Sequence, residues 1–127
     1  MTARLEIDRL LRELYAARVS GDLDGVCRIF SRDAEFQIAG TSQSSPIAII
    51  AVGIDGIRSW LALMIKTFRL NDQTVLSVII DGAKAAVHWR ATIHSRITGA
   101  AVVTELVDLV EIRDGRIASY IEFFVRR

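Results

Sequence analysis

Two carboxylates lie in the last quarter of the chain among residues that otherwise belong in a protein core. Asp108 lies in the segment TELVDLVEI, and Glu122 lies in the segment SYIEFFV. A buried carboxylate costs free energy unless a partner pairs with it or a cavity uses it. These two acids are therefore the first candidates for chemistry in this sequence.

Two acids that lie close together in an apolar site cannot both ionise without a large cost in free energy. One of them then has a raised pKa and can donate a proton, while the other remains a base. We expect Asp108 to be the donor and Glu122 to be the base. A structural alternative stays open, in which Glu122 binds an arginine or a backbone group and Asp108 binds the hydroxyl of Tyr120.

The turn at Arg113-Asp114-Gly115 decides whether the two acids share a face, because a one-residue slip moves every side chain to the other face. A three-residue loop with a glycine bulge pairs Asp108 with Tyr120. It places Glu122 opposite Leu106, so that the two acids share a face with their backbones roughly 7 Å apart. A two-residue loop instead sends Glu122 to the opposite face. We favour the three-residue loop.

The elements that carry these acids follow from the hydrophobic pattern, which changes from a period of 3.6 to a period of 2 after Asn71-Asp72. This order predicts a single α+β domain with helices on one face of a curved sheet. The predicted helices span residues 2–20, 22–30 and 55–68, and the predicted strands span 33–39, 47–52, 74–80, 83–96 and two long strands within 101–125.

The strand at 83–96 has an apolar face and a polar face. Trp89 lies on the apolar face, where it can form the wall of a pocket and stack on a flat ligand. His88 and His94 lie on the polar face, and their six-residue separation corresponds to roughly 20 Å along a strand. They cannot share a metal ion, and we expect no cofactor.

Composition excludes several classes of protein. The chain has 127 residues, and 16 basic residues against 15 acidic ones give a net charge of +1 without a block of like charge. We therefore expect neither a nucleic-acid partner nor a membrane surface. The longest apolar run, 47–54, is too short to span a bilayer. The first residues do not resemble a signal peptide and Cys27 is the single cysteine, so we expect a cytoplasmic protein.

Four stretches together resemble a known superfamily over essentially the whole chain: YAARVSGDLDGVCRIFSRDAEF, GIDGIRSWL, DGAKAAVHWRATIHSRITG and VDLVEIRDGRIASYIEFF. The chain is similar to the SnoaL-like, ketosteroid-isomerase-like branch of the nuclear-transport-factor-2-like superfamily. The resemblance implies one domain over residues 1–127, a cone-shaped barrel in which a strongly curved mixed sheet wraps around three N-terminal helices. It also implies a deep apolar pocket and a homodimer joined through the convex face of the sheet.

Of the three catalytic residues that steroid isomerases use, this sequence keeps one. Their oxyanion-hole acid matches Asp108. Their general base matches Ile38, which cannot accept a proton, and their tyrosine matches Leu14, with Tyr15 one place away. We therefore do not expect a steroid-isomerase mechanism.

Two other branches match in part. Epoxide hydrolases and polyketide cyclases resemble the last strand, where their acid matches Glu122. Those hydrolases also need a partnership between an arginine and an aspartate, and the obvious arginine here is Arg90, which is predicted on the wrong face. Dehydratase-like members use a histidine with a carboxylate in the first helix, where this chain has Ala16-Ala17-Arg18.

The sequence thus predicts an enzyme of the isomerase, cyclase or hydrolase type, with Asp108 and Glu122 performing acid–base chemistry on a hydrophobic, carbonyl-bearing small molecule. The alternative is a non-catalytic module for ligand binding or dimeric assembly, which Ile38 and Leu14 favour. The predicted ligand-binding residues are Tyr15, Trp89, Leu106, Val110, Tyr120 and Phe124.

Overall fold

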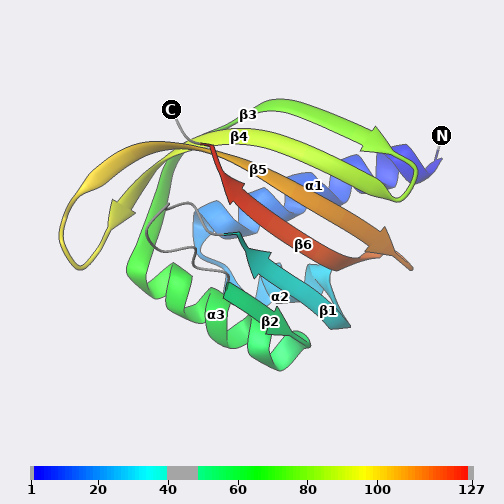
Figure 1. Ribbon diagram of the computed structural model, residues 1–127, viewed down its shortest axis with the longest axis horizontal. Coiled ribbons are helices and arrows are strands. Elements are labelled where there is room, and N and C mark those ends of the chain that lie inside the picture. The colour runs from blue at the N-terminus through cyan, green and yellow to red at the C-terminus, as the bar shows by residue number, and fades with distance from the viewer. Residues whose placement is uncertain (1, 40–48, 126–127) are drawn as a thin grey trace.

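Three helices and a six-stranded sheet make up the computed structural model, which describes residues 2–39 and 49–125 (Figure 1). No helix in these two ranges is long and apolar enough to cross a membrane. The helices are α1 (Thr2–Ser20), α2 (Leu23–Ile29) and α3 (Ile54–Thr67). The strands are β1 (Phe30–Ile38), β2 (Ile49–Val52), β3 (Phe68–Asp81), β4 (Lys84–Ser95), β5 (Ala101–Arg113) and β6 (Arg116–Phe124).

The sheet is mixed, with the strand order β2-β1-β6-β5-β4-β3. The β1–β6 pair is parallel and the other neighbouring pairs are antiparallel. The long strands bend over the helices, so the sheet is curled without closing into a barrel (Figure 1). The predicted α+β class with a strongly curved mixed sheet is confirmed.

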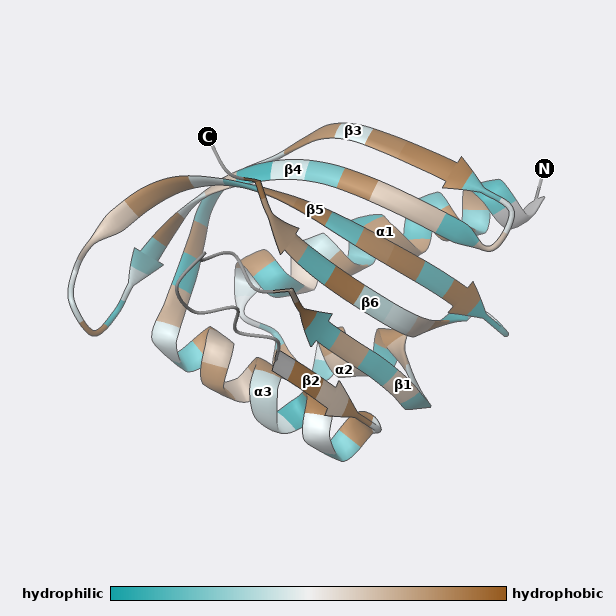
Figure 2. Ribbon diagram, in the orientation of Figure 1, coloured by the Kyte–Doolittle hydropathy of each residue, from teal (hydrophilic) through white to brown (hydrophobic). Residues whose placement is uncertain are grey.

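The core lies between the helices and the concave face of the sheet. Hydrophobic and hydrophilic residues alternate along β5 and β6, as expected for strands with one buried face (Figure 2). On α1 the buried residues Ile7, Leu11 and Leu14 follow a helical spacing, and on β4 the buried residues Val87 and Trp89 follow a strand spacing. The two periods seen in the sequence therefore face each other across one core.

The hairpin between β5 and β6 differs from the predicted register. Arg113 pairs with Arg116 across a two-residue loop. Both loop residues have a positive φ, 54° at Asp114 and 75° at Gly115, which is the geometry of a tight hairpin turn. The predicted three-residue loop is therefore wrong, because the Asp-Gly pair itself matches the twist of the two strands.

A bulge inside β6 nevertheless returns Glu122 to the concave face. Ile112 pairs with Ile117, but Glu111 pairs with Ser119, so Ala118 is an extra residue in its strand. This shift of one position changes the face of every later residue in β6. As a result Glu122 lies directly opposite Asp108, instead of diagonal to it as predicted. Both side chains are buried on one face, as the sequence predicted.

The outer face of the sheet also carries apolar side chains. Ile79 on β3, Leu109 on β5 and Phe123 on β6 are all exposed. Exposed apolar residues gathered on one face of a sheet are typical of a surface that another chain covers. The homodimer implied by the resemblance stays a prediction, and these residues indicate where its interface would lie.

The tight turn gives a test of the hairpin. Gly115→Ala should destabilise the domain by about 1 kcal/mol or more in urea denaturation, because a residue with a Cβ is strained at this positive φ. The space around the Gly115 Cα is open, so the cost is purely conformational. The matched control is Gly56→Ala in α3, whose added Cβ would meet that of Ala51 at an ordinary 3.8 Å. This control should be neutral or stabilising by up to about 1 kcal/mol.

Candidate functional site

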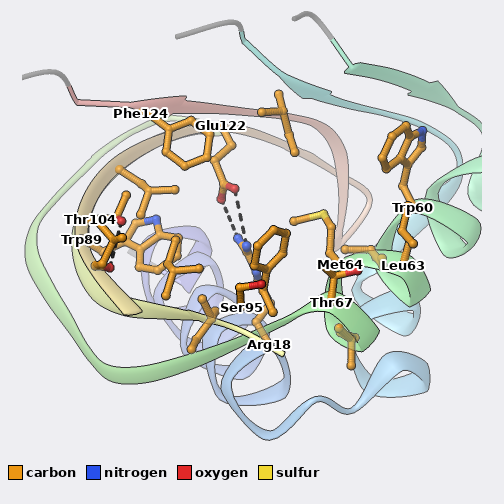
Figure 3. Close-up of a pocket in the computed structure, with 18 of the residues that line it drawn as sticks. Arg18, Trp60, Leu63, Met64, Thr67, Trp89, Ser95, Thr104, Glu122 and Phe124 are labelled. Atoms are coloured by element: carbon orange, nitrogen blue, oxygen red, sulfur yellow. Dashed lines mark hydrogen bonds and ion pairs between the residues drawn. The ribbon is translucent and has the colours of Figure 1, made fainter. Parts of the chain in front are cut away.

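The concave side of the sheet holds a cavity of about 610 Å³ (Figure 3). This volume is in the usual range for small-molecule sites. Apolar side chains from α3, β3, β4 and β5 form most of the wall, among them Trp60, Met64 and Val102. Arg18 and Glu122 supply the charged groups of the wall.

Arg18 and Glu122 form a buried ion pair. Nη1 of Arg18 donates to Oε2 of Glu122 at 2.6 Å, and Figure 3 shows the two side chains pointing toward each other. Their side chains are 9% and 2% exposed. The same Nη1 also donates to the hydroxyl of Tyr120 at 2.9 Å. Arg18 therefore joins the first helix to two side chains of the last strand.

Asp108 lies on β5, beside this ion pair, and is fully buried. Its Oδ2 accepts hydrogen bonds from the Tyr15 hydroxyl at 2.6 Å, from Trp89 Nε1 at 2.7 Å and from the Tyr120 hydroxyl. Its Oδ1 has no hydrogen-bond partner among the described residues. The distance from Oδ2 to Nη1 of Arg18 is 4.0 Å, so Arg18 is close to both acids but donates only to Glu122.

Tyr120 connects the two acids. Its hydroxyl donates to Asp108, accepts from Arg18, and lies 3.4 Å from Oε2 of Glu122. Its ring stacks on Phe36 with the centroids 5.4 Å apart and an interplanar angle of 11°. Packing of the ring therefore fixes the hydroxyl at the centre of the network.

The network holds two acids and one cation, and this imbalance acts on Asp108. Burial raises the pKa of Asp108 well above its ordinary value, the negative charge of Glu122 raises it further, and Arg18 only partly opposes both effects. The hydrogen bond from the Tyr120 hydroxyl lowers the pKa of Asp108, but burial outweighs it. The network thus favours the protonated form of Asp108, while Glu122 is the acid that binds Arg18 directly.

The other groups of the network keep their usual charge. Burial and then the charge of Asp108 raise the pKa of Tyr15 and of Tyr120, so both hydroxyls stay protonated. Burial alone would lower the pKa of Arg18, but Glu122 and then Tyr120 hold it well above its ordinary value. The Arg18 guanidinium also lies 5.2 Å from the centroid of the Trp89 ring, which adds a cation–π contact.

The structure separates the predicted site residues into two layers. The cavity wall contains Glu122, Trp89, Leu106 and Phe124. The layer behind the wall contains Asp108, Tyr15, Val110 and Tyr120, all of them buried.

Arg18 is the functional residue that the sequence interpretation missed. Arg90, the arginine considered there, is exposed on the outer face of β4. The missed signal was the position of Arg18 in α1, seven residues after Leu11 and four after Leu14, which places it at the end of the buried stripe. The contacts of the structural alternative are all present, since Glu122 binds an arginine and Asp108 binds the Tyr120 hydroxyl.

Glu122 occupies the neighbourhood in which the resemblance expected a base. Ile38, which matches the base position of the steroid isomerases, lines the cavity. In the parallel pairing of β1 with β6, Ile38 is the direct neighbour of Glu122. A carboxylate on β6 therefore reaches the same part of the wall as Ile38 on β1. Within the described residues, no group of three or more His, Cys, Asp and Glu side chains could hold a metal ion.

The sequence matches the model of the SnoaL-like domain over residues 11–120. The chain belongs to the SnoaL-like family. No curated protein matches this SnoaL-like chain significantly in sequence.

Solved structures with the same fold as this SnoaL-like domain have low sequence identity to it. A candidate isomerase from Bacillus subtilis has a TM-score of 0.85 at 20% identity, over 98% of this chain and 90% of that one. A LEH-like epoxide hydrolase from M. tuberculosis has a TM-score of 0.77 at 18% identity, over 95% and 84%. A protein from Catenulispora acidiphila with a ketosteroid isomerase-like fold, in complex with trimethylamine, has a TM-score of 0.73 at 15% identity, over 89% and 82%. These likenesses establish the fold of this SnoaL-like domain.

The ion pair gives a stability test. Arg18→Met should cost about 3–5 kcal/mol of unfolding free energy in urea denaturation, because it leaves Glu122 buried without its counter-charge. Adding Glu122→Leu to that variant should restore most of the loss, since apolar residues of similar size can replace a buried pair. The control is Arg12→Met, an exposed arginine of the same helix, which should change stability by less than about 1 kcal/mol. A loss in Arg18→Met no larger than in this control would contradict the buried pair.

Asp108 gives a test through pH. Its pKa is raised in the folded state, so the folded chain binds more protons than the unfolded chain between the two pKa values. Stability from this group is complete below the ordinary pKa of about 4 and is lost as the pH rises toward the folded pKa, by at most about 1.4 kcal/mol per pH unit. Asp108→Asn should remove this part of the decline in urea midpoints measured from pH 4 upward. Parallel profiles for the two proteins would contradict a raised pKa.

Proposed function

We propose that this SnoaL-like domain is an enzyme of the isomerase, cyclase or hydrolase type, which moves a proton on a hydrophobic small molecule bound in the cavity. The observation that carries the proposal is the Arg18–Glu122 ion pair, which lies in the wall of an otherwise largely apolar cavity. A base and a cationic hydrogen-bond donor next to each other in a poorly hydrated site are the groups that proton abstraction from carbon requires.

Glu122 is the base in this proposal. Arg18 orients its carboxylate, and the neighbouring strand places it beside Ile38 at the wall. On a carbonyl-bearing molecule, Glu122 would take a proton from the carbon next to the carbonyl group. The electron pair of that C–H bond would form a C=C bond to the carbonyl carbon, and the π pair of the C=O bond would move onto the oxygen to give an enolate. The protonated Glu122 would then return the proton to carbon. In a ligand with a further C=C bond next to the reacting carbon, the intermediate is a dienolate, and return of the proton to its far carbon gives an isomer.

Arg18 takes the role of the donor to the developing oxyanion. The sequence interpretation assigned this role to Asp108, but Asp108 lies behind the wall and Arg18 lies in it. A guanidinium placed where negative charge develops stabilises the transition state more than the ground state. Asp108 is then a positioning residue, which acts on Glu122 through the hydroxyl of Tyr120.

One observation favours a non-catalytic ligand-binding module instead. The carboxylate of Glu122 is already bound at 2.6 Å by Arg18, and its side chain is only 2% exposed. A base held in this way must exchange part of that contact when it accepts a proton. The two functions therefore share the same cavity and differ only in whether Glu122 exchanges protons with a ligand.

Hydrogen exchange on carbon distinguishes the two functions. The bicyclic ketone 2-decalone, incubated with the protein in D₂O, should gain deuterium next to its carbonyl group faster than in buffer, as followed by mass spectrometry. Glu122→Gln should slow this exchange by roughly 10²- to 10⁴-fold, the usual contribution of a positioned base. The control is Glu111→Gln, a change of the same type on β5 outside the cavity, which should exchange like the original protein.

Equal exchange rates with the original protein and with Glu122→Gln would contradict the enzymatic proposal, provided that both proteins bind the ketone. The non-catalytic ligand-binding function would then account for the cavity. Several cyclic ketones of similar size are compared in parallel, so that the result does not depend on the orientation of one probe.

A further inference from the structure

We infer that the ligand of this cavity is an uncharged molecule with an oxygen acceptor bound by the unused N–H groups of Arg18, and that the cavity discriminates against carboxylates and amines of the same shape. The inference takes the location of the ligand from the proposed function. It adds the chemical class of the ligand and the atoms that recognise it.

Arg18 has hydrogen-bond donors to spare. A guanidinium has five N–H groups. Nη1 uses both of its own on Glu122 and Tyr120, and Nη2 has one long contact of 3.5 Å to Glu122. Within the described residues, no hydrogen bond engages Nε or the second N–H of Nη2.

The spare N–H of Nε is accessible at the cavity wall. In the described part of the chain, the fully buried side-chain nitrogen and oxygen atoms without a partner belong to Gln73, His94 and Asp108. Nε of Arg18 has no partner among the described residues and is not one of these atoms, so it is not fully buried. Because Arg18 lines the cavity, a ligand there can reach this edge of the guanidinium.

Other polar side chains of the wall are neutral, and most of them are already engaged. Ser95 accepts from the backbone N–H groups of Ile97 and Thr98. The Thr104 hydroxyl donates to the Val102 carbonyl, and the Trp89 ring donates to Asp108. Thr67 adds a further hydroxyl, which cannot balance a charge on a ligand. Arg18 is therefore the charged donor that the wall offers to a ligand head group, and the hydroxyls add only neutral hydrogen bonds.

Charge decides which head group fits. The charges of Arg18 and Glu122 cancel, so the ion pair in the wall has no net charge to offer a ligand. A ligand carboxylate would add an uncompensated negative charge in apolar surroundings, next to Glu122. A protonated ligand amine would likewise add an uncompensated positive charge, next to Arg18. A ketone, ester or epoxide oxygen accepts from Arg18 without adding charge.

The test compares four molecules with one bicyclic body: 2-decalone, 2-methylenedecalin, decalin-2-carboxylate and 2-aminodecalin. Both tryptophans of the chain, Trp60 and Trp89, line the cavity, so their fluorescence reports binding to the full chain at pH 7. The ketone should bind roughly tenfold or more tightly than each of the other three, the usual effect of one hydrogen bond to a charged group. Equal or tighter binding of the alkene, the carboxylate or the amine would overturn the inference.

A variant links this preference to Arg18. In the double variant Arg18→Met with Glu122→Leu, the ketone and its alkene analogue should bind within about twofold of each other, because the donor is gone. A ketone preference that persists in this variant would overturn the assignment to Arg18. If the variant does not fold, the comparison of the four molecules with the original protein still decides the ligand class. Selective ketone binding without hydrogen exchange would contradict the enzymatic proposal alone.

Discussion

The buried ion pair between Arg18 and Glu122 joins the first helix to the last strand, two elements at opposite ends of the chain. Each charge is costly to bury alone, so each one requires the other in place. The pair also fixes the position of Tyr120, which accepts from Arg18 and donates to Asp108. The polar end of the cavity can therefore form only when α1, β5 and β6 are all folded against one another.

The sequence was sufficient to predict the α+β class, because it follows from the period of the hydrophobic pattern. The shared face of the two acids was predicted from a three-residue loop that the structure does not have, and it holds because a bulge in β6 compensates for the shorter loop. The sequence was insufficient to predict the pairing register of β5 with β6. The Asp-Gly turn and the extra residue Ala118 each move Glu122 to the other face of β6, and only their combination returns it to Asp108. Bulges depend on how a strand bends around its core, so their positions are weakly encoded in local sequence.

Arg18 was missed for a different physical reason. A basic residue in the last turn of a helix is normally interpreted as a favourable partner for the helix dipole, with its charge in water. Its burial here depends on two carboxylates more than 80 residues later in the chain, which no local pattern contains. The stronger clue was the charge of the core. Two buried acids require a buried cation, and the buried face of α1 ends at Arg18.

Ile38 stands where steroid isomerases have a base, which in the sequence favoured a non-catalytic module. That argument is weaker in the structure, because β1 and β6 are parallel neighbours and Ile38 pairs with Glu122. Two adjacent strands can present side chains to nearly the same point of a cavity, so Glu122 on β6 can serve the part of the wall that Ile38 borders. Unlike the base that steroid isomerases carry at the position of Ile38, Glu122 is bound directly by an arginine, Arg18. A base held in this way must give up part of that contact when it accepts a proton. The contact also places a guanidinium next to the proton acceptor, where charge would develop on a ligand oxygen. Any catalysis by this domain must therefore rely more on stabilising the oxyanion than on a strong base.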